Sequence, residues 1–132
     1  MLKNRFVLFA ICMLSSYLVM AQKNITEIQF EKDEIILNGK KAFDYQKEGN
    51  NYAILDLKGN ELITGEIGKN DEGEWFSIIT FKIVDKTFSN KKIIGRNHLI
   101  FALVEENVFQ KNLKINKKKL LKFIKKYNEL ED

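Results

Sequence analysis

The spacing of apolar residues changes once along this chain, near residue 95, and this change limits the fold class more than any other feature. Before it, short apolar runs with a two-residue period are separated by turn residues, which is typical of strands. After it, apolar residues recur at helical spacing. Strands followed by helices predict an α+β fold, with an antiparallel sheet of about six or seven strands (a meander of hairpins) and then two C-terminal helices.

The segment Asn51–Ile67 is the clearest hairpin in the chain. Its first run is apolar at nearly every position up to Leu57. Asp56 and Gly59 then supply turn chemistry, because Asp accepts a backbone N–H two residues on and Gly adopts positive φ without a steric cost. We expect Leu57 to be buried in the first strand, so that Leu57→Asp would impair folding while Lys58→Ala would not.

Further strands are expected on both sides of this hairpin. Asn38-Gly39 is the strongest short turn signal, since both residues tolerate the positive φ of a tight hairpin. The most β-prone run is Trp75–Val84, which we expect in the middle of the sheet. The other predicted strands are 25–30, 35–37, 40–48 and, as a short last strand, 91–94.

Two helices are expected after the change of period. Asn97 is the predicted cap of the first helix and Asn116 that of the second. Leu99, Ile100, Leu103 and Val104 form the apolar stripe of the first helix, and Leu120, Leu121, Ile124 and Tyr127 that of the second.

Residues 1–21 have the pattern of a cleavable signal peptide. Lys3 and Arg5 precede an apolar run over 6–20, which ends at a small residue, Ala21. The run is about 15 residues, whereas a membrane-spanning helix needs about 20. The alternatives are a transmembrane anchor and a lipoprotein signal with Cys12 as the lipidated residue. We therefore expect one small domain over residues 22–132, located in the periplasm or outside the cell.

Removing this leader changes the charge and the available chemistry. The formal net charge falls from +4 to +2, because residues 1–21 hold two basic residues and no acidic one. The only cysteine, Cys12, is lost, which excludes disulfides and thiol chemistry in the mature chain. Residues 22–90 are net acidic and residues 91–132 are net basic. Either the two parts attract each other in the fold, or the basic part faces an anionic partner.

Arg96, Asn97 and His98 are a candidate anion site. They stand where a helix begins, and free backbone N–H groups at a helix N-terminus favour anions. His98, the only histidine, adds a group that changes charge near neutral pH. The structural alternative is a strand end at Gly95, a cap at Asn97 and a solvated histidine.

The second predicted helix carries a basic face. It is either a solvated surface or a site for anionic lipid or polysaccharide, with only peripheral membrane contact. Nucleic acid is not expected, because the aromatic residues that stack on bases are missing between the lysines. The residues are Lys117, Lys118, Lys119, Lys122, Lys125 and Lys126.

Other chemistries find less support. The segment Asn70–Glu74 gathers oxygen ligands, but its spacing does not match a calcium loop, so no metal is expected. There is no phosphate loop or dinucleotide fingerprint, so no cofactor is expected. A carboxylate enzyme needs two acids held in a cleft, and the sequence selects no pair. The candidates are Asp44, Glu48, Asp56, Glu61 and Glu66.

Two patterns resemble known proteins. The Ala21-Gln22 junction and the composition rich in Lys and Asn resemble small exported proteins of Bacteroidota. The pattern Tyr52-x-Ile54-x-Asp56-x-x-Gly59-x-x-Leu62 is similar to hairpins in their secreted β-domains, including sorting domains, but it is a turn signature that implies no activity.

The leading expectation for function is an exported, non-catalytic binding or accessory protein. Its partner would be a protein, a glycan or another envelope component. The alternatives are a small hydrolase that uses carboxylates and an envelope-associated protein that binds through the basic helix. A deep pocket lined by two carboxylates would favour the hydrolase, whereas a flat or apolar exposed sheet face would favour binding.

Overall fold

The computed structural model of the chain describes residues 23–130. They form a seven-stranded antiparallel meander followed by two helices, which confirms the predicted α+β class. Each strand pairs with the next along the chain. The predicted signal peptide, residues 1–21, lies outside the described residues. The elements are β1 (Ile28–Phe30), β2 (Glu34–Leu37), β3 (Lys40–Glu48), β4 (Asn51–Leu55), β5 (Glu61–Lys69), β6 (Trp75–Phe81), β7 (Lys86–Phe88), α2 (Arg96–Glu105) and α3 (Lys117–Tyr127).

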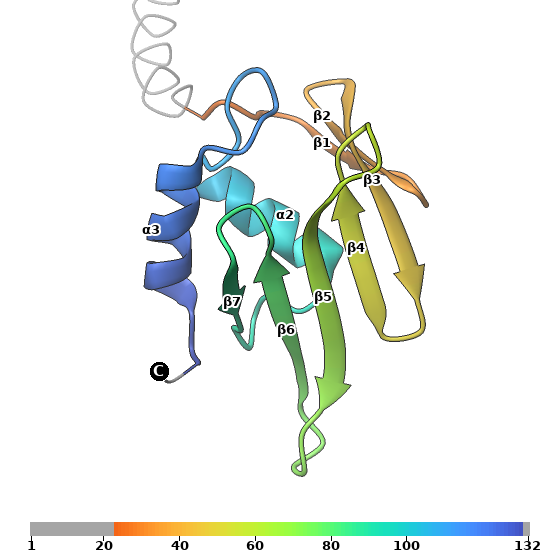
Figure 1. The fold of residues 1–132 in the computed structure, drawn as a ribbon, viewed down its shortest axis with the longest axis vertical. Coiled ribbons are helices and arrows are strands. Elements are labelled where there is room, and N and C mark those ends of the chain that lie inside the picture. The colour runs from red at the N-terminus through yellow and green to blue at the C-terminus, as the bar shows by residue number, and fades with distance from the viewer. Residues whose placement is uncertain (1–22, 131–132) are drawn as a thin grey trace, which may run out of the picture.

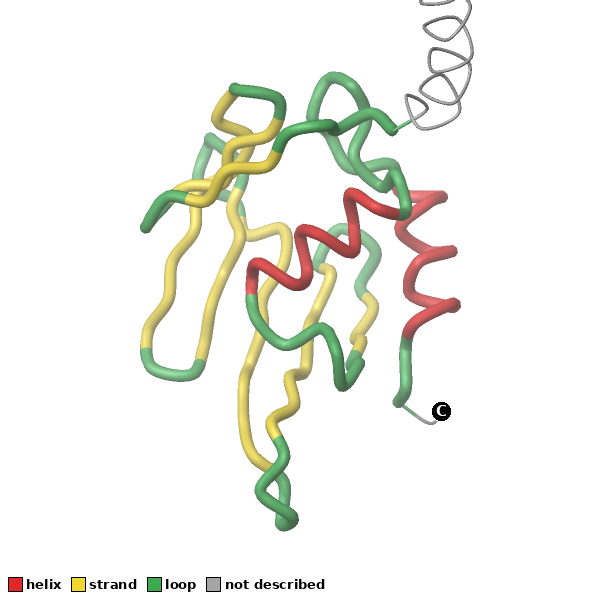
Figure 2. Tube along the Cα trace, turned by 180° about the vertical axis from the view of Figure 1, so that it is seen from behind, coloured by secondary structure: helices red, strands yellow, loops and turns green. Residues whose placement is uncertain are grey.

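The helices leave much of one sheet face uncovered. Figure 1 looks onto this face, with α2 passing behind β5 and β6. Figure 2 shows the opposite side, where α2 crosses the sheet and α3 stands beside β7. No helix within residues 23–130 has both the length and the apolar character needed to cross a bilayer. The sheet therefore has a packed inner face and an open outer face.

The core lies between the inner face of the sheet and the helices. Ile54 and Ile63 stand opposite each other on β4 and β5, and Ile63 stands opposite Phe81 on β6. Phe123 of α3 stacks on Phe88 at 5.3 Å between ring centroids and meets Phe81 edge-on at 6.3 Å. Burial of each such side chain contributes about 1.5–3 kcal/mol. The predicted stripe of α2 is confirmed as buried: Leu99, Ile100, Leu103 and Val104.

The predicted hairpin turns are confirmed in their backbone geometry. Asn38 and Gly39 both have positive φ, 53° and 76°, as a tight hairpin turn requires. In the β4–β5 turn, one carboxylate oxygen of Asp56 accepts from the backbone N–H groups of Lys58 and Asn60, each at 2.9 Å. Gly59 follows at φ 89°. The local residue types therefore determined these turns.

Leu57 is a correction to the hairpin. β4 ends at Leu55, and Leu57 lies in the turn with 55% of its surface exposed. The expectation that Leu57 is buried in the first strand is therefore wrong, which removes the reason for expecting Leu57→Asp to impair folding. The error arose because the turn begins at Asp56, one residue before the apolar run ends.

The end of the sheet also differs from the prediction. β7 occupies 86–88, where no strand was predicted, and the predicted strand over 91–94 reduces to one bridge between Asn90 and Ile93. β6 is second from the edge rather than in the middle of the sheet. Buried Ser77 ties β6 to this segment, since its hydroxyl donates to the Ile93 carbonyl at 3.0 Å.

The helix ends and stripes are partly corrected. Gly95, not Asn97, precedes α2 as the cap, and it provides no side-chain hydrogen bond. Asn116 caps α3 as predicted, because its side chain accepts from the Lys119 N–H at 3.1 Å. Leu121 is 44% exposed, and Phe123, which the stripe omitted, is buried instead. At 100° per residue, Phe123 lies nearer the centre of the buried stripe than Leu121 does.

Candidate functional site

A row of polar side chains crosses the open face of the sheet. Residues that stand opposite each other on neighbouring strands share a face of the sheet. One such row takes a residue from each strand β3 to β7: Gln46, Ala53, Thr64, Thr80 and Thr87. Ala53 is small, and the threonines are short and carry hydroxyl groups. The side chains in the middle of this face are thus short, and most of them can form hydrogen bonds.

This row forms the floor of an open furrow of about 660 Å³. Its centre is Ala53, Thr64 and Thr80, and its lining comes from β3 to β6. Glu48 and Glu66 stand at one end, as the cross-strand neighbours of Asn51. The furrow therefore combines hydroxyl groups with exposed carboxylates, and we call it the outer furrow.

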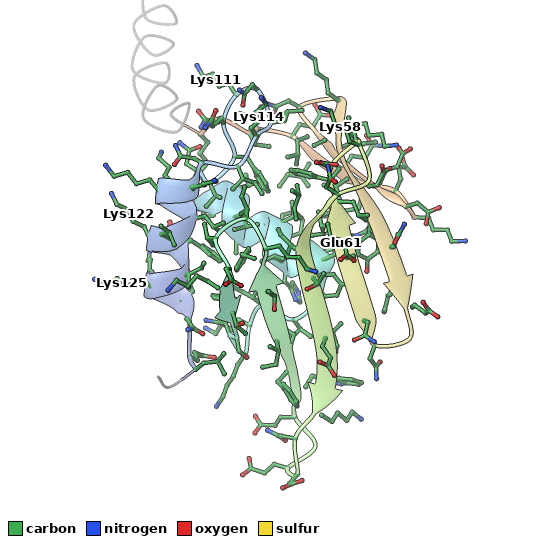
Figure 3. All side chains as sticks on the ribbon, viewed as in Figure 1. Lys58, Glu61, Lys111, Lys114, Lys122 and Lys125 are labelled. Carbon is green, nitrogen blue, oxygen red and sulfur yellow. The ribbon has the colours of Figure 1, made fainter. Side chains whose placement is uncertain are left out.

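Glu61 lines the furrow at the next row along the strands. Its carboxylate accepts from the ammonium group of Lys82 at 3.1 Å. Figure 3 shows Glu61 on the uncovered side of the sheet. This ion pair partly neutralises Glu61, so Glu48 and Glu66 hold most of the negative charge of the furrow, against one lysine of its lining, Lys47.

The other candidate carboxylates are engaged elsewhere. Asp44 pairs with Lys41 at 2.7 Å. Asp56 belongs to its own turn, where hydrogen bonds from Asn60 and Lys58 hold the pKa of its carboxyl below the ordinary value. The structure thus brings Glu48, Glu61 and Glu66 together on one face and places Asp44 and Asp56 apart from them.

The candidate anion site is occupied by contacts within the protein. The guanidinium of Arg96 lies over the rings of Tyr45 at 4.1 Å and Phe30 at 5.0 Å. Its Nη1 donates to the Glu31 carbonyl at 2.8 Å, and its Nε donates to the Asn97 side chain at 3.0 Å. His98 is exposed. Arg96 therefore fastens the start of α2 to β1 and β3, and anion binding there stays a prediction.

The basic face of α3 points to solvent. Figure 3 shows Lys122 and Lys125 extending away from the helix. Among the described residues, only Lys126 of the lysines between 111 and 126 forms an ion pair, with Glu106. Leu121, half-exposed, lies between Lys118 and Lys125 on the same stripe. This face is thus basic with an apolar residue at its centre.

The acidic and basic parts of the chain do not neutralise each other through ion pairs. The one pair that joins them within residues 23–130 has the opposite polarity, with Lys23 from the first part and Glu105 from the second. The remaining pairs lie within one part. Both expectations from the charge pattern stay predictions.

The outer furrow was missed as a site by sequence reasoning. Its signal was present in the polar positions of the strands, since Gln46, Thr64 and Thr80 alternate with core residues. A register is needed to place them in one row, because a shift of one residue moves a strand's side chains to the other face.

The predicted loop Asn70–Glu74 is a hairpin turn. Its Asn70 side-chain oxygen accepts from the backbone N–H groups of Glu72 and Glu74 at 3.0 and 2.9 Å. Within the described part of the chain, no cluster of three or more metal-ligand side chains is present.

Comparisons with family models, curated proteins and solved structures gave no match for this chain.

Proposed function

We propose that this chain is an exported, non-catalytic binding protein that holds a polar, hydroxyl-rich ligand on the outer face of its sheet. The observation that carries the proposal is the outer furrow. It lies on a face that the helices leave open, and its floor of Ala53, Thr64 and Thr80 leaves room above the backbone. Because the furrow is open and its floor is shallow, it suits binding of an extended ligand better than catalysis, which needs a site that encloses the reacting bond.

The chemistry of the furrow favours glycans among the envelope components. Hydroxyl and amide groups of Thr64, Thr80 and Gln46 both donate and accept hydrogen bonds, and the carboxylates of Glu48 and Glu66 accept from sugar hydroxyls. The negative charge disfavours anionic polymers. A segment of a neutral or amino sugar polymer fits these groups best.

Binding is tested with residues 22–132 and immobilised oligosaccharides of neutral, amino and anionic sugars. We expect retention on neutral or amino sugars and at least a tenfold loss for Thr64→Arg, which fills the furrow. Thr87→Arg is the matched control, because Thr87 belongs to the same row but does not line the furrow. Retention on no sugar, or equal loss in both variants, would contradict the proposal.

The hydrolase alternative uses the same furrow and is separated by its product. Glu48 and Glu66 flank the strand that carries Asn51, and both are exposed. Incubation of the bound oligosaccharides followed by measurement of new reducing ends tests this alternative. We expect no product above the level of a Glu48→Gln/Glu66→Gln variant, and product above that level would establish the hydrolase.

A second candidate function uses the basic face of α3. The supporting observation is that Lys118, Lys122 and Lys125 have no ion-pair partner among residues 23–130 and surround the half-exposed Leu121. We propose peripheral binding to anionic lipid through this face as the alternative. Co-sedimentation with vesicles containing anionic lipid should fall with salt and with Lys118→Glu/Lys122→Glu/Lys125→Glu. Failure to bind at low salt excludes it.

Export is part of the proposal and has its own test. Expression of the full chain in a Bacteroidota host, followed by N-terminal sequencing of the extracytoplasmic form, should give Gln22 as the first residue. An uncleaved cytoplasmic product would contradict export.

A further inference from the structure

A second hollow lies at the end of the molecule, apart from the outer furrow. It is a groove of about 530 Å³ between the β4–β5 turn and the connection from α2 to α3. Figure 3 places Lys58 of the first segment and Lys114 of the second at this same end. The apolar part of the lining is Ala42, Phe43, Leu57, Leu62, Ile83, Leu113 and Ile115.

The two segments that form the groove are turns of one kind. In the β4–β5 turn, Gly59 N–H donates to the Asp56 carbonyl at 3.1 Å, and Asp56 N–H donates to the Asn60 carbonyl at 2.9 Å. In the connection, Leu113 N–H donates to the Gln110 carbonyl at 2.9 Å, and Gln110 N–H donates to the Lys114 carbonyl at 2.7 Å. The fourth residue of this turn needs positive φ, for which Gly is suited.

The turn at Asn70–Glu74 has the same pair of hydrogen bonds, and its fourth residue is Gly73 at φ 79°. Gly59 takes φ 89°, but Leu113 takes φ 71° at the same position. A bulky side chain in this region costs about 1–2 kcal/mol. Leu113 therefore places an apolar side chain over the groove in a conformation that its own backbone disfavours.

The charge at the rim of the groove is positive. Lys58 and Lys114 form no ion pair with another residue of the range 23–130. The third lysine, Lys41, is neutralised by Glu34 and Asp44 at 3.4 and 2.7 Å. The carboxylate of Asp56 also lies at the rim, where it accepts hydrogen bonds from its own turn and attracts the Lys58 ammonium group. The two ammonium groups of Lys58 and Lys114 thus outnumber this one carboxylate beside an apolar floor.

We propose that this groove binds a single-chain anionic amphiphile, of which a fatty acid is the simplest form. The alkyl chain lies against Leu57, Leu62 and Leu113, and the carboxylate lies between the ammonium groups of Lys58 and Lys114. A volume of about 530 Å³ lies within the range of small-molecule sites, roughly 300–1,000 Å³. The half-exposed Leu57, which lies in the turn after β4, has a role in this site as the wall of the groove.

The binding test uses residues 22–132 and dodecanoate below its micelle concentration, followed by backbone amide shifts. We expect saturable shifts in 56–60 and 110–115. Decanoate should bind more weakly, by up to about fourfold for each methylene removed. Butyrate should not bind, and dodecyltrimethylammonium should bind at least tenfold more weakly than dodecanoate. Shifts elsewhere only, or equal affinity for the cationic chain, would overturn the proposal.

Two pairs of variants separate the alkyl and charge contributions. Leu113→Gly keeps the turn and relieves its strain but removes a side chain packed against the core, so the protein should remain folded, as the thermal melt checks, while affinity falls at least tenfold. Leu121→Ala, at an exposed leucine outside the groove, should leave affinity unchanged. Lys58→Glu/Lys114→Glu should reverse the preference between dodecanoate and dodecyltrimethylammonium, whereas the equally charged Lys32→Glu/Lys92→Glu should not. Unchanged affinity in Leu113→Gly would overturn the site.

Anionic vesicles distinguish this groove from a membrane surface. If Leu113→Gly loses dodecanoate binding but keeps vesicle binding, the groove is a site for a monomeric amphiphile. Vesicle binding that disappears with Leu113→Gly, together with absence of dodecanoate binding, would refute the monomeric ligand.

Discussion

The ring of Tyr52 on β4 lies directly over Gly65 on β5. The two are cross-strand partners on the inner face of the sheet, and a Cβ atom on Gly65 would come within 2.2 Å of the ring carbons of Tyr52. Tyr52 is 3% exposed, so its ring is enclosed by protein and can move away only by disturbing its neighbours. The absence of a side chain at Gly65 is what admits a tyrosine to this part of the core.

Gly65→Ala should therefore destabilise the protein by about 2 kcal/mol, as overpacked cores do. Urea unfolding followed by circular dichroism measures this change. Gly68→Ala is the control: it lies on the same strand, but its added Cβ would stand 3.1 Å from Phe76, so a smaller loss is expected. Equal losses at both glycines would contradict the account of Tyr52.

Tyr52→Phe should be neutral or stabilising by up to about 1 kcal/mol at neutral pH. The buried hydroxyl of Tyr52 has no hydrogen-bond partner among residues 23–130, and its removal ends a desolvation cost. Burial also raises the pKa of Tyr52 above its ordinary value of 10.0. Neutral Tyr52 therefore makes its full contribution to the stability of the folded protein below pH 10, and this contribution is lost as the pH rises above 10. Unfolding midpoints between pH 8 and 11 should fall less for Tyr52→Phe than for the parent chain.

Arg96→Ala should cost about 1–2 kcal/mol, because it removes a cation from two aromatic rings and a hydrogen bond to the Glu31 carbonyl. Arg96→Lys should recover only part of the loss, since an ammonium group does not stack as a planar guanidinium does. Thermal melts measure both. His98→Ala, at the exposed neighbour, should melt with the parent.

The same variants decide between packing and anion binding at Arg96. Titration with sulfate and observation of the His98 ring resonances provides the readout. With Arg96 engaged in packing, we expect no shift. A saturable shift in the parent that is lost in Arg96→Ala would establish the anion site.

Glu106→Gln should flatten the acid side of the stability profile. Hydrogen bonds from Lys126 and from the Tyr127 hydroxyl, the latter at 2.9 Å, hold the pKa of Glu106 below its ordinary value of 4.5. A lowered pKa stabilises the fold above pH 4.5, and this contribution is lost as the pH falls through the folded-state pKa. Melting temperatures from pH 7 to pH 3 should therefore fall more in the parent than in Glu106→Gln. If the two proteins lost the same melting temperature over this pH range, the stabilising contact of Glu106 with Lys126 and Tyr127 of α3 would be contradicted.

Gly73→Ala should cost about 1 kcal/mol, although nothing lies within 4 Å of the added Cβ, because φ there is 79°. Gly95→Ala is the matched control, since that site is equally open but has φ −98°. Because Gly95 is also the N-cap of α2, where Gly is preferred to Ala, the urea midpoint should be lower for Gly73→Ala by less than this full backbone cost. A Gly73→Ala protein as stable as Gly95→Ala would remove the strain argument for Leu113.

The sequence by itself determined the class of fold and the local turns. The change of hydrophobic period near residue 95 predicted strands followed by helices, and Asn38, Asp56 and Gly59 predicted their turns, because these signals depend only on neighbouring residues. β3 has the predicted bounds, Lys40–Glu48, and Asn116 caps α3 as expected.

Only the tertiary structure decided which surfaces remain open. Composition did not distinguish Leu57 and Leu121, which are exposed, from Phe123, which is buried, because the difference depends on where the turn and helix meet their neighbours. The register of four strands, β3 to β6, brings Gln46, Thr64 and Thr80 into one row. Leu57 and Leu113 line one groove although they stand far apart in the chain. Such contacts join distant segments, and no local pattern encodes them.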